Sequence, residues 1–138
     1  MALFRTGQSG AAVAIGPLEA AVMEVLWDGG TVMPVPEVHR RLAGQGRELS
    51  YSAVKAVLNN LAGKGLLTKD KLGKVTRFVP VKSRADFDAD VLAEVIGGLK
   101  RNFGTPAIAQ LVGELAVDEQ SLAEFERIIA QRRGELEE

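Results

Sequence analysis

One stretch of sequence decides the fold: "SYSAVKAVLNNLAGKGLLTKDKLGKVTRFVPV", which runs from Ser50 to Val81. Its first half places apolar side chains three and four residues apart, the spacing of one face of a helix, at Val54, Val57, Leu58 and Leu61. Ser50 suits the N-cap of such a helix, and Gly63 and Gly65 suit its end. The sequence therefore predicts a helix over residues 50–64, whose other side carries Ser52, Ala56 and Asn59, flanked by Lys55 and Asn60.

The second half of the stretch predicts a β-hairpin over residues 66–81. Two β-prone runs, 66–71 and 75–81, are joined around Leu72 and Gly73, where glycine takes a positive φ easily. Cations lie along and beside this hairpin, at Lys64, Lys69, Lys71, Lys74 and Arg77. A helix with small outward side chains is thus followed directly by a basic ribbon.

Two shorter helices are predicted before this stretch. "GPLEAAVMEVLWDGG", from Gly16, sets Leu18, Val22, Val25 and Leu26 on one face, and "PVPEVHRRLAG" predicts a helix that begins near Pro36. Three helices followed by a hairpin is the order of a winged helix-turn-helix domain, which we assign to residues 16–82. Residues 1–15 are expected to form a flexible tail. The predicted fold class is mainly α with a small β-hairpin.

Charge is distributed unevenly along the 138 residues, although the net charge is only −1. Residues 37–82 carry ten Lys and Arg against three Asp and Glu, for +7, whereas residues 83–138 carry six against twelve, for −6. An asymmetry of this size indicates a part that binds a polyanion, joined to a part with another role.

These observations predict contacts with duplex DNA. In a winged helix the third helix enters the major groove, and short outward side chains let it approach the bases closely. The expected base-reading residues are Ser52, Ala53, Ala56, Asn59 and Asn60, with either Asn suited to an adenine edge and the alanines to thymine methyl groups. The expected phosphate-binding residues are Arg40, Arg41, Ser50, Lys55, Lys64, Lys69, Lys71, Lys74 and Arg77.

The chain after Ser83 has a purely helical pattern. Three short amphipathic helices in about 55 residues cannot bury their apolar stripes well alone, and a second copy of the chain is the simplest partner. We therefore expect residues 83–138 to form a helical dimerisation domain. Its expected interface residues are Phe87, Val91, Val95, Leu99, Ile108, Leu111, Leu115, Leu122, Phe125, Ile128 and Ile129.

The sequence gives little support to catalysis. The single histidine, His39, stands beside Arg40 and Arg41 without a motif that supplies a nucleophile, and no HExxH, Walker or GxGxxG motif occurs. There is no cysteine. We therefore predict no catalytic residue, no metal site and no cofactor. The sequence also shows no apolar run that would span a membrane, so that a cytoplasmic location is expected.

Three motifs resemble the BlaI/MecI family of penicillinase repressors: "LEAAVMEVLW" (Leu18–Trp27), "SYSAVKAVLNNLAGKGLL" (Ser50–Leu67) and "RFVPV" (Arg77–Val81). The resemblance is close over residues 16–82 and extends more weakly through "FGTPAIAQLVGEL" to the C-terminal acidic helix. It implies a dimeric transcriptional repressor that binds an inverted-repeat operator. In several members a membrane metalloprotease sensor triggers cleavage of the repressor and relieves repression, so the resemblance adds such a sensor to the implied partners.

This chain departs from the family pattern in its recognition helix. Family members usually carry Thr where this chain has Ala53 and Ala56, and often Arg where it has Asn60, so the resemblance does not carry an operator sequence over. Asn102-Phe103 resembles the bond that is cut in well-known members, but it precedes the corresponding segment, near Leu111–Leu115. An asparagine at a helix end and a core phenylalanine explain it equally well.

The departures keep an alternative function open. In that alternative the chain is a winged-helix protein-interaction module without specific DNA binding, and its basic wing meets an acidic protein surface. Salt-dependent binding to duplex DNA with a preference for one palindrome separates the two functions.

Overall fold

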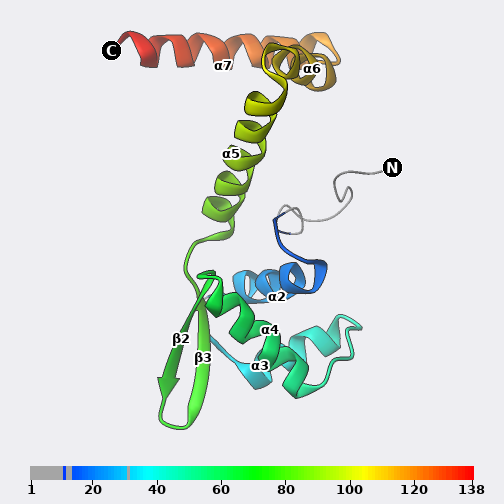
Figure 1. The fold of residues 1–138 in the computed structure, drawn as a ribbon, viewed down its shortest axis with the longest axis vertical. Helices are drawn as coiled ribbons and strands as arrows, with labels where there is room; N and C mark the ends of the chain where they lie inside the picture. The colour runs from blue at the N-terminus through cyan, green and yellow to red at the C-terminus, as the bar shows by residue number, and fades with distance from the viewer. Residues whose placement is uncertain (1–10, 12–13, 31) are drawn as a thin grey trace. The chain divides into compact units, whose positions relative to one another are not determined.

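The computed structural model describes residues 11, 14–30 and 32–138. The chain divides into two compact units, Met1–Ala93 and Glu94–Glu138. The first unit contains the helices α2 (Pro17–Asp28), α3 (Val35–Gly44) and α4 (Tyr51–Gly63), the strands β1 (Met33–Pro34), β2 (Leu67–Leu72) and β3 (Val75–Pro80), and the first half of α5 (Arg84–Phe103) (Figure 1). The second unit contains the rest of α5, α6 (Thr105–Leu115) and α7 (Glu119–Glu137).

The predicted winged helix-turn-helix is confirmed. Helix α4 begins after Ser50, whose hydroxyl accepts a hydrogen bond from the backbone N–H of Ala53 at 3.1 Å, as expected of an N-cap. Strands β2 and β3 pair antiparallel from Leu67↔Pro80 to Leu72↔Val75, and Gly73 takes a φ of +64° in the turn. The fold class is therefore mainly α with a small antiparallel sheet.

Strand β1 was not predicted. Met33 and Pro34 pair antiparallel with Phe78 and Arg77, so that the sheet has three strands in the order β1-β3-β2. A strand of two residues is too short to show an alternating pattern, and Pro34 argues against a strand unless the strand lies at an edge, as it does here. Only the tertiary pairing with β3 defines this element.

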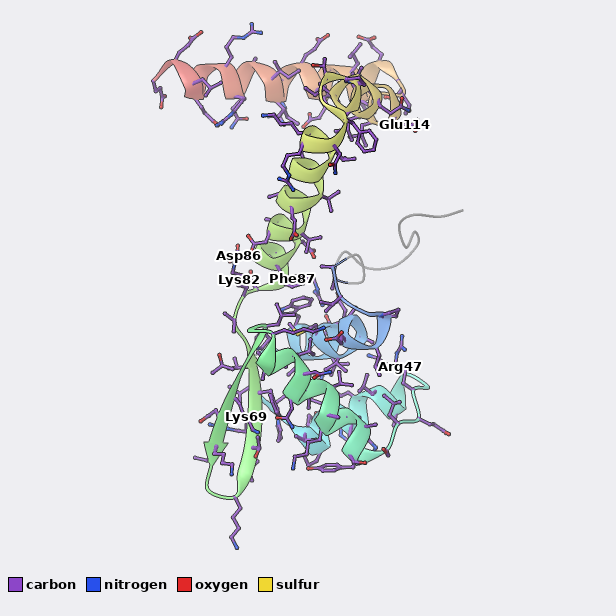
Figure 2. All side chains as sticks on the ribbon, in the orientation of Figure 1. Arg47, Lys69, Lys82, Asp86, Phe87 and Glu114 are labelled. Atoms are coloured by element: carbon purple, nitrogen blue, oxygen red, sulfur yellow. The ribbon has the colours of Figure 1, made fainter. Side chains whose placement is uncertain are left out.

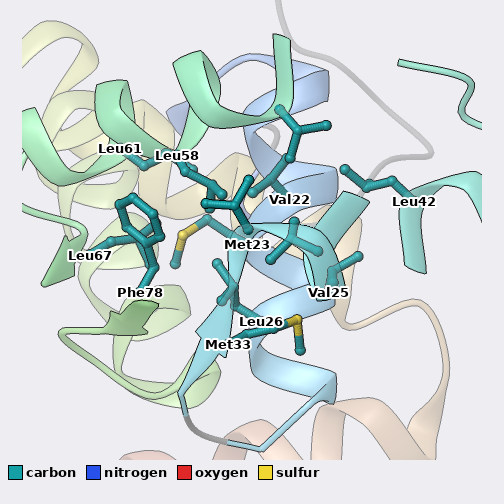
Figure 3. Packing of buried hydrophobic residues seen from close by; sticks show 13 residues of the cluster. Val22, Met23, Val25, Leu26, Met33, Leu42, Leu58, Leu61, Leu67 and Phe78 are labelled. Atoms are coloured by element: carbon teal, nitrogen blue, oxygen red, sulfur yellow. The ribbon is translucent and has the colours of Figure 1, made fainter. Parts of the chain in front are cut away.

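One apolar core holds these elements together (Figure 3). Helix α4 contributes Val54, Leu58 and Leu61, all with no exposed surface, and these side chains belong to the same cluster as Phe78 of β3. Burying a side chain of this size stabilises the fold by about 1.5–3 kcal/mol. Helix α2 supplies Val22, Met23, Val25 and Leu26 to the cluster, and α3 supplies Val35, Val38 and Leu42.

A smaller cluster anchors the start of α5 on the winged helix. Phe87 is 7% exposed and its ring centroid lies 5.3 Å from that of Trp27. The indole N–H of Trp27 donates to the carbonyl of Lys82 at 3.0 Å, and the Arg84 guanidinium lies over the indole at 5.6 Å. Arg84 also pairs with Glu24 and Asp28, both at 2.6 Å, and its hydrogen bond to Asp28 raises the pKa of the guanidinium.

This cluster corrects the assignment of Phe87 to the dimer interface. Phe87 follows the same apolar stripe as Val91 and Val95, but its partner is Trp27 of the same chain. Sequence periodicity identifies the face of a helix that is buried, but it does not say which surface covers that face. Of the expected tail, residues 1–10 and 12–13 lie outside the described residues, while Ala11 is buried in this cluster with Ala20 and Phe87.

The second unit leaves most of its apolar side chains exposed. Helices α6 and α7 bury no residue of their own, and Phe103 at the end of α5 is 63% exposed, so that it is not the core residue that the sequence suggested. Leu99, Phe103, Pro106, Ala107, Gln110 and Leu111 line an apolar hollow of about 280 Å³ between α5 and α6. Large exposed apolar residues of this unit are Ile96, Phe103, Ile108, Val112, Leu115, Val117, Leu122, Ile128, Ile129 and Leu136.

Removing Leu58 from the core should destabilise the first unit strongly. We expect Leu58→Ala to lower the free energy of unfolding by about 2–5 kcal/mol, because the truncation leaves a cavity under α4. Asn60→Ala, on the exposed side of the same helix, is the matched control and should change it by no more than about 0.5 kcal/mol. Urea unfolding followed by the fluorescence of Trp27, the single tryptophan, measures both; equal effects would contradict the assignment of the buried face.

Candidate nucleic-acid interface

Helix α4 turns one face to the core and the other to solvent. With Val54, Leu58 and Leu61 buried, the residues on the opposite side are set by the helical repeat. Of the expected base-reading residues, Ser52, Ala56 and Asn60 are exposed, whereas Ala53 and Asn59 are half-buried. The structure therefore brings all five to the outer side or its margin, and none points into the core.

The beginning of α4 is held by a second set of contacts. His39 Nε2 lies 2.7 Å from the carbonyl oxygen of Leu49, and the His39 ring meets the Tyr51 ring edge-on, with centroids 6.1 Å apart. The hydroxyls of Ser50 and Ser52 are 3.3 Å apart. These contacts of His39 join α3 to the residues at and just before the start of α4.

Two residues near this helix start were missed by the sequence reasoning. Tyr51, the first residue of α4, is 47% exposed, and Arg47 is exposed in the connection before it (Figure 2). Both lie beside the N-terminus of α4, where free backbone N–H groups and the helix dipole favour an anion. The sequence signal that could have identified Arg47 is its position three residues before the N-cap Ser50.

The hairpin of β2 and β3 has two faces with different charge. Directly opposite residues of an antiparallel pair share a face, so Lys69 lies on the side of Phe78, and Asp70 lies on the other side with Arg77. Arg77 forms an ion pair with Asp70 across the strands. Lys69 Nζ donates to Asn59 Oδ1 of α4 at 3.0 Å and so joins the hairpin to the helix.

The expected phosphate-binding residues differ in how far their charge is already neutralised. Arg40 and Arg41 both bind Glu37, at 2.5 and 2.9 Å, and their hydrogen bonds, that of Arg40 foremost, lower the pKa of Glu37. Lys64 binds Glu19 at 2.8 Å. Lys55, Lys71 and Lys74 have no hydrogen-bond or ion-pair partner in the described part of the chain.

Within this expected set, the cations without a partner in the described residues therefore lie on α4 and around the turn of the hairpin. Lys71 and Lys74 flank Leu72 and Gly73 at the hairpin tip, and both are exposed. Exposed ion pairs such as Lys64–Glu19 contribute little to stability. A paired cation can therefore replace its carboxylate partner with a phosphate at a small cost in free energy. The free cations need no such exchange, which makes them the strongest candidates for phosphate contact.

Other kinds of site find no support in the described residues. Nowhere in residues 11, 14–30 and 32–138 do three or more His, Cys, Asp or Glu side chains gather in a way that would hold a metal ion. Over the same ranges, every helix falls short of the length and apolar character that crossing a membrane requires.

Three helices, of which the third is capped by Ser50, and a basic hairpin define a winged-helix protein. A model of the penicillinase repressor family matches residues 15–131. The transcriptional regulator BlaI of two Mycobacterium tuberculosis strains is 30% identical over 118 residues, which cover 81% of this chain and 85% of the relative. The chain belongs to the penicillinase repressor family and is a transcriptional regulator of the BlaI type, in a family that is not enzymatic.

Solved structures with a similar course of the chain were also found. RosR of H. salinarum is 18% identical, with a TM-score of 0.47 and coverage of 89% of this chain and 97% of that chain. A MarR family protein from Bacillus stearothermophilus is 15% identical, with a TM-score of 0.45 and coverage of 90% and 76%.

The free and the paired lysines should respond differently to removal. We expect Lys74→Ala to weaken binding to all duplexes alike and to reduce the slope of log affinity against log salt by about one unit. Lys64→Ala should reduce the slope less, because Glu19 already neutralises this ammonium group. Anisotropy titrations of several duplexes at a series of salt concentrations measure both slopes. A loss confined to one duplex sequence would contradict the phosphate assignment of Lys74.

Proposed function

We propose that this chain is a dimeric repressor that binds an inverted-repeat operator in duplex DNA through α4 and the hairpin of β2 and β3. The observation that carries the proposal is the outer side of α4, where small and polar side chains are exposed on the same helix as the unpaired Lys55. The hairpin that follows carries the unpaired Lys71 and Lys74 at its tip. Side chains of this size let a helix approach base edges in the major groove, while the cations meet the phosphates.

The base-reading residues of the proposal are Ser52, Ala53, Ala56, Asn59 and Asn60. The phosphate-binding residues are Arg40, Arg41, Ser50, Lys55, Lys64, Lys69, Lys71, Lys74 and Arg77. Arg47 and Tyr51 join the second group, because they lie exposed at the start of α4. The proposed dimerisation segment starts at about residue 94 and not at residue 83, because the first turns of α5 pack on Trp27.

A second copy of the chain is the proposed cover for the second unit. Ile108, Leu115 and Ile128 are each at least half exposed, which is unusual for large apolar side chains on neighbouring helices. A two-fold dimer would bury such surfaces and place two recognition helices about 34–36 Å apart, one turn of DNA. The proposed interface comprises Val95, Leu99, Ile108, Leu111, Leu115, Leu122, Phe125, Ile128 and Ile129, joined by the exposed Ile96 and Phe103, and leaves out Phe87 and the neighbouring Val91.

Relief of repression by proteolysis is part of the proposal on the ground of family membership. Its partner would be a membrane metalloprotease sensor. Mass spectrometry of the repressor recovered from induced cells tests this step, because a cut within residues 94–138 would divide the proposed dimerisation unit and leave the DNA-binding unit without part of its interface. An intact chain in cells whose target genes are expressed would contradict it.

Dimerisation should depend on the apolar side of α7. We expect Ile128→Glu to convert a dimer into a monomer and to lower operator affinity by at least tenfold, because each half then binds without the effective concentration that its twin provides. Ala123→Glu places the same charge on the other side of α7 and should leave the dimer intact. Sedimentation and operator titration of both variants measure the two effects. A wild-type chain that is monomeric at micromolar concentration would overturn the dimer.

The protein-interaction alternative has its own outcome. If the wild-type dimer binds duplex DNA with the same affinity whatever its sequence, or does not bind it at all, the repressor proposal fails. Selection of bound fragments from a randomised duplex library gives this result directly. A palindromic preference supports the proposal.

A further inference from the structure

The hydrogen bond between the hairpin and the recognition helix joins two residues that were assigned different roles. Lys69 was expected to bind phosphate and Asn59 to read a base, yet Lys69 Nζ donates to Asn59 Oδ1 at 3.0 Å. Asn59 is half-buried on the outer side of α4 (Figure 2 labels Lys69 on the hairpin beside this helix). Whatever Asn59 presents to a ligand is therefore constrained by Lys69.

The sheet register explains why Lys69 reaches α4 rather than solvent. Lys69 lies directly opposite Phe78, whose ring is buried in the core, and two residues after the buried Leu67. All three side chains thus start from the face of the sheet that is turned to the core. Lys69 stands further along the hairpin, where the core ends, and its long stem carries the ammonium group to the edge of α4. Arg77 and Asp70 pair on the opposite face and do not compete.

The chemistry of the two groups fixes the orientation of the Asn59 side chain. An ammonium group only donates hydrogen bonds, so the amide atom that faces Lys69 must be the carbonyl oxygen. The amide nitrogen then points away from Lys69 with both of its hydrogens free, since no further hydrogen bond to this side chain exists within the described residues. Asn59 is oriented before any ligand arrives.

We propose that Lys69 and Asn59 together present only hydrogen-bond donors to the base edges of the major groove. The pair thereby selects guanine at one position of each operator half-site. This inference rests on the proposed binding to duplex DNA. In the major groove, guanine presents two acceptors, N7 and O6, whereas adenine presents one acceptor and one amino donor. A bidentate contact of Asn with adenine requires the amide oxygen, and one of the two lone pairs of the Asn59 oxygen already accepts from Lys69. The ammonium charge beside it disfavours the adenine amino group further.

Asn60 provides the internal contrast. It is exposed on the same side of α4, and within the described residues its side chain has no hydrogen-bond partner. It retains both the oxygen and the amino group for an adenine edge, so that the two neighbouring asparagines would read different bases. Lys69 is in this account a specificity-determining positioning residue, distinct from the lysines that meet only phosphates.

The test uses the full-length protein and a randomised duplex library, from which bound fragments are selected and sequenced. Lys69→Met keeps the length and the apolar stem of the side chain but removes the donor. We expect it to lower discrimination for guanine at one position of each half-site by about tenfold, with adenine gaining there. Lys69→Arg, which keeps a cationic donor, should retain the guanine preference. Lys74→Met is the matched control and should lower affinity for all duplexes without a change in preference.

A double-substitution cycle checks that the two residues act through the same base. If they do, Asn59→Ala combined with Lys69→Met should cost no more discrimination at that position than Asn59→Ala alone. Thermal unfolding of each variant, followed through Trp27, shows that the fold is kept. An unchanged guanine preference in Lys69→Met, or fully additive effects, would overturn this inference and leave the repressor proposal standing. A wild-type protein that selects no sequence at all would instead overturn the proposed function.

Discussion

The burial of one stripe of α4 is the constraint on which the rest of the winged helix depends. Val54, Leu58 and Leu61 have no exposed surface, and they pack in the same cluster as residues of α2, α3 and β3. Because a helix is rigid, fixing this stripe in the core also fixes what faces outward. The outer side of α4 could carry long cations, but it carries Ser52, Ala56 and Asn60, and the cations are displaced to its margins and to the hairpin. The residues proposed to read bases and the core residues of α4 therefore lie on opposite sides of the same helix.

The same core sets where the charged side chains of the hairpin lie. Phe78 holds β3 against the helices, and the register with β2 then decides on which face each lysine lies. Lys69 is directed to α4, Arg77 is neutralised by Asp70, and Lys71 and Lys74 remain free near the turn. Five cations that look alike in the sequence therefore differ in their contacts: Lys69 bonds to Asn59, and Lys64 and Arg77 are paired with carboxylates. Lys71 and Lys74 have no partner in the described part of the chain. These differences in contact arise from the geometry of the fold and the placement of the carboxylates, and composition alone does not predict them.

The junction with α5 shows the same dependence on tertiary contacts. Trp27 donates to the Lys82 carbonyl, packs against Phe87 with the two rings tilted, and lies under Arg84, so the first turns of α5 belong to the winged-helix unit. The boundary between the units accordingly lies within a continuous helix, after Ala93, and not at the change of pattern near Ser83. A chain cut after Lys82 would lose Phe87 and expose the cluster that it closes. The remaining helices keep their apolar residues at the surface, which is the physical reason for seeking a second copy.

Local rules were sufficient for much of this protein. The spacing of Val54, Leu58 and Leu61, the Ser50 cap and the glycine of the hairpin turn are short-range features, so the sequence by itself determined the order of the helices and hairpin, the outer side of α4 and the family. Strand β1, the partner of Phe87 and the bond between Lys69 and Asn59 join residues that are at least ten positions apart. No periodicity encodes such contacts, because they arise only when the packed core brings separate elements to one place. The tertiary structure alone decided which cations are free and how Asn59 is oriented.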